Sequence, residues 1–89
     1  MSEFGPVLTA AAVRDLEKIA PKTAEPLLAF IFGGLADNPR RRGKPLEREL
    51  GGLWSARRGD YRVIYRLDDE AKSLFVLRIA HRSRVYRPR

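Results

Sequence analysis

The spacing of hydrophobic residues is helical in the first third of the chain and alternating in the second half. In residues 10–20, Val13, Leu16 and Ala20 recur at intervals of three and four and form one apolar stripe. This spacing predicts an amphipathic helix, and Thr9 immediately before it is a suitable N-cap. The first element is therefore expected to be a helix that packs one face on a core.

A second helix is predicted to begin at Pro21 or Thr23 and to end near Leu35. If Thr23 is the N-cap, Pro26 falls in the first turn, where its missing N–H group is tolerated. The link between the two helices is short, so they should form an antiparallel hairpin. The residues expected on the core face of the second helix are Leu27, Leu28, Phe30, Ile31 and Leu35.

Alternating apolar and polar residues predict strands over residues 53–58, 61–67 and 73–81. Gly59 and Asp60 are typical turn residues, so the first two strands should form a hairpin. The middle strand has one apolar face and one largely basic face. Its apolar face carries Tyr61, Val63, Tyr65 and Leu67, and its other face carries Arg62, Ile64 and Arg66.

The predicted strand over residues 73–81 is almost continuously apolar until Arg78, as in a strand covered on both faces. Strict alternation places Arg78 on the same side as Leu74, Val76 and Arg82. It also points His81 toward the helices, which favours a structural role for that imidazole. The tail over residues 81–89 is too polar for a core and is expected to form one helical turn.

These elements predict an α+β fold, in which an N-terminal helix hairpin packs on one face of a small antiparallel sheet of about four strands. Residues 6–8 are expected to be an edge strand, which makes the sheet mixed at its edge. Residues 36–52 read as a long basic connection, with a short helical turn over residues 46–50. The chain, residues 1–89, is expected to be one domain.

Composition narrows the class of protein. The chain is 44% hydrophobic and 33% charged, as in soluble globular proteins. It has no run of about 18 apolar residues that could span a membrane, and its start lacks the features of a signal peptide, so we expect a cytoplasmic protein with no membrane contact. There is no cysteine and only one histidine, which argues against a disulfide scaffold and a metal site. We expect no cofactor.

The positive charge is confined to one half of the chain. Residues 1–39 carry 3 basic and 5 acidic side chains, a net charge of −2, whereas residues 40–89 carry 15 basic and 6 acidic side chains, a net charge of +9. Most of the basic residues are arginine, which suits phosphate forks and stacking on bases. A polyanion, and nucleic acid first, is therefore the expected partner. An arginine-rich composition alone would not explain the confinement.

The uncovered face of the predicted sheet carries Arg57, Arg62, Arg66, Arg78 and Arg82. One interpretation is a solvated face. The other is a phosphodiester site, because guanidinium groups stabilise charge that develops on phosphate oxygens. An RNA 2′-hydroxyl can attack its own phosphate without an enzyme nucleophile or a metal, if a base and an acid assist. Tyr86 can stack on a nucleobase or anchor the tail.

Four segments together resemble a known family. They are residues 43–46 (Gly-Lys-Pro-Leu), 52–55 (Gly-Leu-Trp-Ser), 59–65 (Gly-Asp-Tyr-Arg-Val-Ile-Tyr) and 79–86, which contains Ile-Ala-His-Arg and Val-Tyr. With the order of elements, they resemble the RelE-type toxins of bacterial type II toxin–antitoxin modules, over essentially the whole chain. The resemblance implies a RelE-like fold and a ribosome-dependent mRNA endonuclease that cleaves the codon in the A site.

The resemblance also implies roles for individual residues. Arg62 and Arg82 would stabilise the reacting phosphate, Arg57 would contact RNA or that phosphate, and Tyr86 would stack on or orient the base. Further RNA contacts are expected from the basic run, the basic face and the tail: Arg40, Arg41, Arg42, Lys44, Arg66, Arg78 and Arg84.

This chain departs from the family at the general base. The best-known member has two lysines on the first hairpin strand, and the matching positions here are Leu53 and Ser55. The replacement candidates are Glu47 and His81. The implied partners are an acidic RelB-like antitoxin, in a higher-order complex, and the ribosome. The alternatives are a non-catalytic relative, either a ParE-like gyrase inhibitor or a decayed toxin that binds only its antitoxin, and an RNA-binding protein without cleavage.

Overall fold

The protein folds around one five-stranded sheet with the strand order β1-β5-β4-β3-β2. The structure is a computed structural model that describes residues 3–46 and 51–84, with only the backbone described for Arg84. All neighbouring strands are antiparallel except β1 and β5, which run parallel. The strands are β1 (Gly5–Leu8), β2 (Lys44–Pro45), β3 (Leu53–Arg58), β4 (Tyr61–Asp68) and β5 (Ser73–His81).

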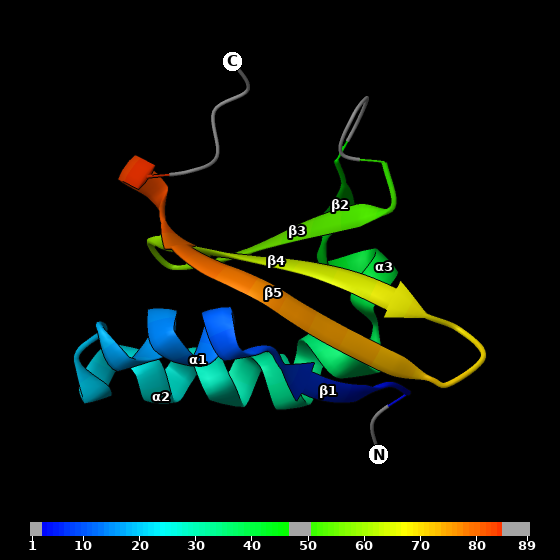
Figure 1. Ribbon diagram of the computed structural model, residues 1–89, viewed down its shortest axis with the longest axis horizontal. Helices are drawn as coiled ribbons and strands as arrows, with labels where there is room; N and C mark the ends of the chain where they lie inside the picture. Colours follow the sequence, from blue (N-terminus) through cyan, green and yellow to red (C-terminus); the bar gives the residue numbers. More distant parts are fainter. Residues whose placement is uncertain (1–2, 47–50, 85–89) are drawn as a thin grey trace.

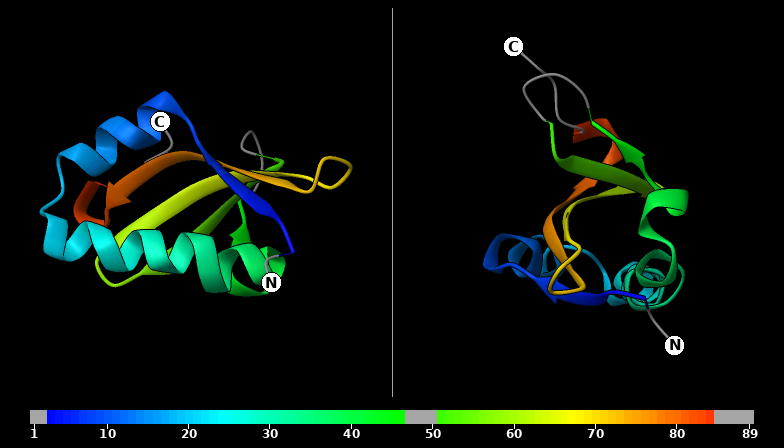
Figure 2. Two further views of the ribbon diagram at one scale, coloured as in Figure 1. Left: turned by 90° about the horizontal axis from the view of Figure 1, so that it is seen from below. Right: turned by 90° about the vertical axis from the view of Figure 1, so that its right-hand side faces the viewer.

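The helices are α1 (Ala10–Glu17), α2 (Pro21–Phe30), the π-helical turn η1 (Ile31–Leu35), α3 (Pro39–Arg42) and the 3₁₀ turn η3 (Arg82–Arg84). Helices α1 and α2 run in opposite directions on one side of the sheet (Figures 1 and 2). Within the described residues, no helix combines the length and the apolar character needed to cross a membrane. The α+β prediction is confirmed, with five strands among the described residues instead of about four.

Several element boundaries differ from the predicted ones. Helix α1 ends at Glu17, and α2 begins at Pro21, so Pro26 lies inside the helix and not in its first turn. The connection expected after residue 36 contains α3 and the short strand β2. Both were missed because each is only a few residues long, and α3 is made of proline and arginine.

The core lies between the sheet and the two long helices. Leu27, Ile31 and Leu35, each four residues from the next, are buried against Val63 and Tyr65 of β4. Three of the five residues predicted for the core face of the second helix are therefore fully buried, and the other two, Leu28 and Phe30, are partly buried.

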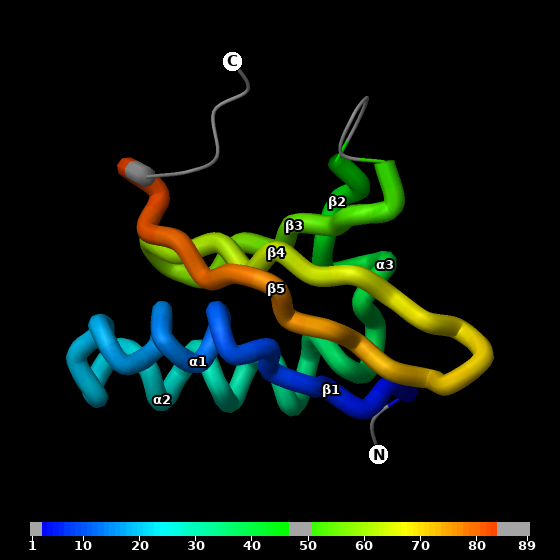
Figure 3. The backbone as a smooth tube through the Cα atoms, viewed as in Figure 1, coloured from blue at the N-terminus to red at the C-terminus, as the bar shows by residue number. Residues whose placement is uncertain are grey.

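Thr9 joins α1 to the sheet. Its hydroxyl accepts from the backbone N–H of Ala12 (3.3 Å), which confirms the predicted N-cap, and donates to the carbonyl of Val76 in β5 (2.8 Å). In Figure 3 the blue chain of β1 follows the orange chain of β5 and then turns into α1. The first helix is thus attached at the point where β1 stops covering the edge of β5.

A β-bulge in β5 reverses the faces of that strand. Tyr65 of β4 pairs with Val76, whereas the preceding Ile64 pairs with Arg78, which leaves Leu77 as the extra residue. Val76 before the bulge and Ile79 after it are consequently both buried. The apolar run that looked like a strand covered on both faces is therefore a strand that changes register.

Beyond the end of β1, helix α1 closes the free edge of β5. The carboxylate of Asp15 accepts from the backbone N–H of Ile79 (2.8 Å) and from Arg78 Nε and Nη2 (2.8 and 3.1 Å). The hydrogen bond from Arg78 is the main reason that the pKa of Asp15 lies below its ordinary value. One side chain thus satisfies a strand-edge donor that would otherwise have no β partner.

Candidate functional site

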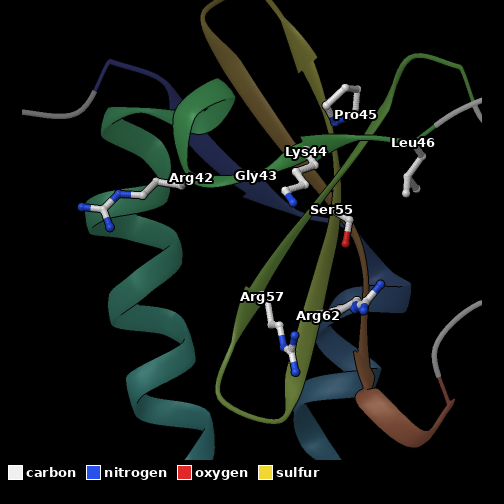
Figure 4. Close-up of a pocket in the computed structure, with 8 residues that line it drawn as sticks. All are labelled: Arg42, Gly43, Lys44, Pro45, Leu46, Ser55, Arg57 and Arg62. Atoms are coloured by element: carbon white, nitrogen blue, oxygen red, sulfur yellow. The ribbon is translucent and has the colours of Figure 1, made fainter.

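A cavity of about 390 Å³ lies where β2, β3 and β4 meet, and we call it the arginine cavity (Figure 4). Arg57 and Arg62 alternate with the buried residues Ala56 and Val63, so their side chains leave the sheet on the face opposite the helices. The residues that line it are Arg42, Gly43, Lys44, Pro45, Leu46, Ser55, Arg57 and Arg62.

Arg57 and Arg62 occupy directly opposite positions on β3 and β4. In the part of the chain that the structure describes, no carboxylate forms an ion pair with either residue. Like charges directly opposite one another on a sheet destabilise it. The arrangement is therefore suited to an anion held between the two guanidinium groups.

Lys44 brings a third cation into the arginine cavity. It pairs with Ser55 across β2 and β3, and Ser55 shares a strand face with Arg57. In Figure 4 the lysine side chain extends from β2 toward Ser55. Ser55 occupies a position where the best-known member of the family has a lysine. In this structure it lines the cavity next to Lys44.

Gly43 sets the position of β2. A Cβ atom at this residue would lie 2.0 Å from the hydroxyl oxygen of Tyr65 and 2.9 Å from the carbonyl oxygen of Ser55. Burial raises the pKa of Tyr65 to about 12, so the phenol stays protonated and donates to the carbonyl of Pro39. Only glycine allows the chain to pass this close to the buried tyrosine and place Lys44 next to β3.

The other basic residues before β2 lie elsewhere. Arg40 donates two hydrogen bonds to the carboxylate of Asp69 (3.0 and 2.8 Å), and these lower the pKa of Asp69. Although it borders the cavity, the Arg42 side chain turns toward α2 (Figure 4) and packs against Gly34 of η1. Arg41 lines a separate cavity of about 480 Å³ with Asn38 and Arg42.

The predicted convergence of five arginines on one face is only partly found. Arg66 stays on that face but lies over the Phe75 ring, 4.7 Å from its centroid. Arg78 stands opposite Ile64, so the bulge places it on the predicted face, but its guanidinium pairs with Asp15 of α1 and is not free beside the other arginines. Arg82 lies outside the cavity, with Nη1 3.9 Å from a carboxylate oxygen of Asp60.

His81 is directed away from the arginine cavity. Its ring meets the Tyr61 ring edge-on, with 5.2 Å between centroids, and its Nδ1 atom accepts from the backbone N–H of Ser83 (3.1 Å). These contacts agree with the structural role expected for it. The other candidate base, Glu47, lies outside the described residues, as do Tyr86 and the side chain of Arg84.

Sequence reasoning missed the acidic partners and the close packing of Gly43. Asp15 and Asp69 each face an arginine predicted to bind RNA, and Asp60 faces Arg82, which is predicted to stabilise the reacting phosphate. No local pattern marks such pairs, because their members are far apart in the chain. The run Gly-Lys-Pro at residues 43–45 was a usable signal, since a glycine before a strand often marks a close backbone contact.

Comparisons with known proteins identify the family. A family model described as the ParE toxin of the type II toxin–antitoxin system, parDE, matches residues 7–86. Toxin RelG of Mycobacterium tuberculosis is 49% identical over 79 residues, which cover 89% of this chain and 91% of RelG. Toxin RelE of the same organism is 50% identical over 80 residues, which cover 90% of this chain and 82% of that toxin.

A solved structure of a similar sequence has the same fold. A chain in the crystal structure of the toxin–antitoxin complex RelBE2 from Mycobacterium tuberculosis has a TM-score of 0.87 and 46% identity, over 90% of this chain and 99% of that chain. The family model, the two relatives and this structure all come from toxins or toxin–antitoxin complexes. The chain therefore belongs to the ParE toxin family of type II toxin–antitoxin systems and is a RelE-type toxin.

Proposed function

We propose that this toxin is an endoribonuclease that enters the A site of the ribosome, cleaves the mRNA codon there and so inhibits translation. The observation that carries the proposal is the pair Arg57 and Arg62, directly opposite on neighbouring strands and, among the described residues, without a carboxylate partner. Two guanidinium groups of this kind suit a phosphodiester whose charge grows during the reaction.

In the proposed reaction the 2′-oxygen of the RNA attacks the adjacent phosphorus. The O2′–P bond forms as the P–O5′ bond breaks, which leaves a 2′,3′-cyclic phosphate and a 5′-hydroxyl. The 2′-hydroxyl must lose a proton and the 5′-oxygen must gain one. Arg57 and Arg62 stabilise the phosphate oxygens, Arg82 adds charge from η3, and Tyr86 stacks on the base. Because the nucleophile belongs to the RNA, this route needs no metal.

The proposed partner outside the ribosome is an acidic antitoxin. The RelBE2 structure is a toxin–antitoxin complex, and residues 40–89 of this chain carry a net charge of +9. An antitoxin that places carboxylates on Arg57 and Arg62 would keep the cytoplasmic toxin inactive. Co-purification of this chain from its native operon should recover a small acidic protein in a higher-order complex. Recovery of the toxin alone would contradict this part of the proposal.

Inducible expression followed by mapping of mRNA 5′ ends tests the proposal. The expected result is growth arrest with new 5′ ends inside translated codons, and no such ends when translation initiation is blocked. Cuts that ignore the reading frame, or that persist without ribosomes, would contradict ribosome-dependent cleavage.

A second candidate function is inhibition of DNA gyrase without RNA cleavage. The match to a family model described as the ParE toxin favours it. The same expression experiment separates the two functions, because a gyrase inhibitor induces the DNA-damage response and leaves translated codons intact. If neither signal appears, the chain only binds its partner.

A further inference from the structure

The proposed reaction needs a group that takes the proton of the 2′-hydroxyl, and the arginine cavity contains one suitable side chain. Among the described residues that line it, there is no carboxylate, imidazole or phenol. Arginine is not deprotonated in proteins, and a serine hydroxyl is a poor proton acceptor. The remaining side chain is the primary amine of Lys44, a group that serves as a general base in other enzymes.

The position of Lys44 fits this task. It stands opposite Ser55 on the neighbouring strand, on the face that carries Arg57 and Arg62. Within the described residues no carboxylate binds its ammonium group. The close contact of Gly43 with Tyr65 holds this short strand against β3, so the lysine is attached to a packed element.

We propose that Lys44 is the general base of the cleavage reaction, an assignment that rests on the proposed ribonuclease function. In this step the uncharged amine form of Lys44 takes the proton from the 2′-hydroxyl at Nζ as the O2′–P bond forms, and becomes an ammonium group. The P–O5′ bond breaks, and the 5′-oxygen takes a proton from water. Arg57 and Arg62 hold the phosphate oxygens throughout. Lys44 thus supplies from β2 the amine that the chain lacks at Leu53 and Ser55 on β3.

The test compares Lys44→Arg with Lys44→Ala in single-turnover cleavage of an A-site codon on purified ribosomes. Lys44→Arg keeps the positive charge but cannot accept the proton, so its cleavage rate should fall by about 100-fold or more. Its ribosome affinity should stay close to that of the wild type. Lys72→Arg is the matched control, because Lys72 lies in the β4–β5 turn beside Glu3 and should tolerate the change.

Chemical rescue separates proton transfer from a structural role. A small primary amine added to Lys44→Ala should restore part of the rate, and a tetraalkylammonium ion of similar size should not. A substrate with a 5′-sulfur leaving group needs no acid, so Lys44→Arg should remain slow on it if Lys44 is the base. Recovery on that substrate would make Lys44 the acid and overturn the assignment as base.

The remaining outcomes distinguish failure of the Lys44 assignment from failure of the proposed ribonuclease function. If the wild type cleaves and Lys44→Arg cleaves equally well, Lys44 is not the base and the ribonuclease function stands. Loss of cleavage in Glu47→Gln with full activity in Lys44→Arg would assign the role to that carboxylate. If the wild type does not cleave on ribosomes, the proposed function fails, and the assignment of Lys44 fails with it.

Discussion

At the scale of single residues, the arrangement of Arg57 and Arg62 opposes stability and favours anion binding. They face each other on adjacent strands, and like charges in such positions repel. Arg40, Arg78 and Arg82 each have an acidic neighbour, whereas this pair has none among the described residues. We therefore expect losses at these two positions to affect function more than folding.

Arg62→Ala should reduce codon cleavage by about 100-fold or more, since removal of one group that stabilises developing charge has effects of that size. The free energy of unfolding should change by less than about 0.5 kcal/mol, as for other surface substitutions. Thermal unfolding and the ribosome assay measure the two effects. Arg14→Ala, at an exposed position of α1, is the control and should keep both the cleavage rate and the free energy of unfolding. An unfolded Arg62→Ala protein would show that the arginine is structural.

Gly43→Ala should destabilise the protein, because the new methyl group would overlap the Tyr65 hydroxyl at 2.0 Å. Overpacking of this kind costs about 1–3 kcal/mol, and the cleavage rate should also fall as β2 moves away from β3. Gly33→Ala is the matched control, since no atom lies within 4 Å of a Cβ there. Denaturant unfolding of both variants checks the prediction, which equal stabilities would refute.

At the scale of elements, the sheet is completed by contacts between segments that are distant in sequence. β1 covers the first half of β5, and the carboxylate of Asp15 covers part of the second half. The Asp15 side chain is only 11% exposed and serves both the Ile79 amide and the Arg78 guanidinium. One ionised group thus contributes to the junction of α1 with the sheet, beside the hydrogen bond from Thr9 to Val76.

Asp15→Ala should lower the free energy of unfolding by about 1–3 kcal/mol, because the buried Ile79 N–H loses its acceptor. Asp15→Asn should be milder, since its amide oxygen can still accept that bond. If both variants lose the same free energy of unfolding, the effect comes from the ion pair with Arg78 and not from the hydrogen bond that the Ile79 N–H donates.

Acid should weaken the same contact. Because the pKa of Asp15 is below its ordinary 3.8 in the folded protein, its stabilisation is present above that value and is lost as pH falls through the folded pKa. The difference in melting temperature between the wild type and Asp15→Asn should therefore shrink from about pH 6 to about pH 3. A constant difference across this range would contradict the role of the ionised carboxylate.

At the scale of the whole molecule, charge and architecture are divided in the same way. The segment up to residue 39, which forms β1, α1 and α2, has a net charge of −2, and the segment from residue 40 onward has +9. Helices α1 and α2 lie on one side of the sheet (Figure 1), and Arg57 and Arg62 project from the other. The molecule thus has a basic sheet face on the side opposite the helices, which is suited to a polyanion.

Binding to ribosomes should therefore weaken steeply as salt rises from about 50 to about 200 mM, through release of counterions from the RNA. Each lost phosphate contact should reduce the slope of log K against log salt by about 1. Arg57→Ala should show this reduction, and Arg14→Ala on α1 should keep the wild-type slope. An affinity that stays flat over this range would rule out binding dominated by the RNA backbone.

The amino-acid sequence by itself determined the local features of this protein. Helical spacing identified the helix hairpin and the buried Leu27, Ile31 and Leu35, and Thr9 was recognisable as a cap. Alternation identified β3, β4 and β5 and put Arg57 and Arg62 on one face. These features could be read because the side chain's direction follows from its position within one element.

Only the tertiary structure decided which side chains meet. A bulge shifts β5 against β4 and leaves Arg78 opposite Ile64, on its predicted face, but the side chain pairs with Asp15, 63 residues away. Arg40 is bound by Asp69, 29 residues away, and Lys44 reaches the arginine cavity because Gly43 fits against Tyr65. Periodicity records which side of an element is apolar, but register, bulges and partners depend on the packing of distant segments.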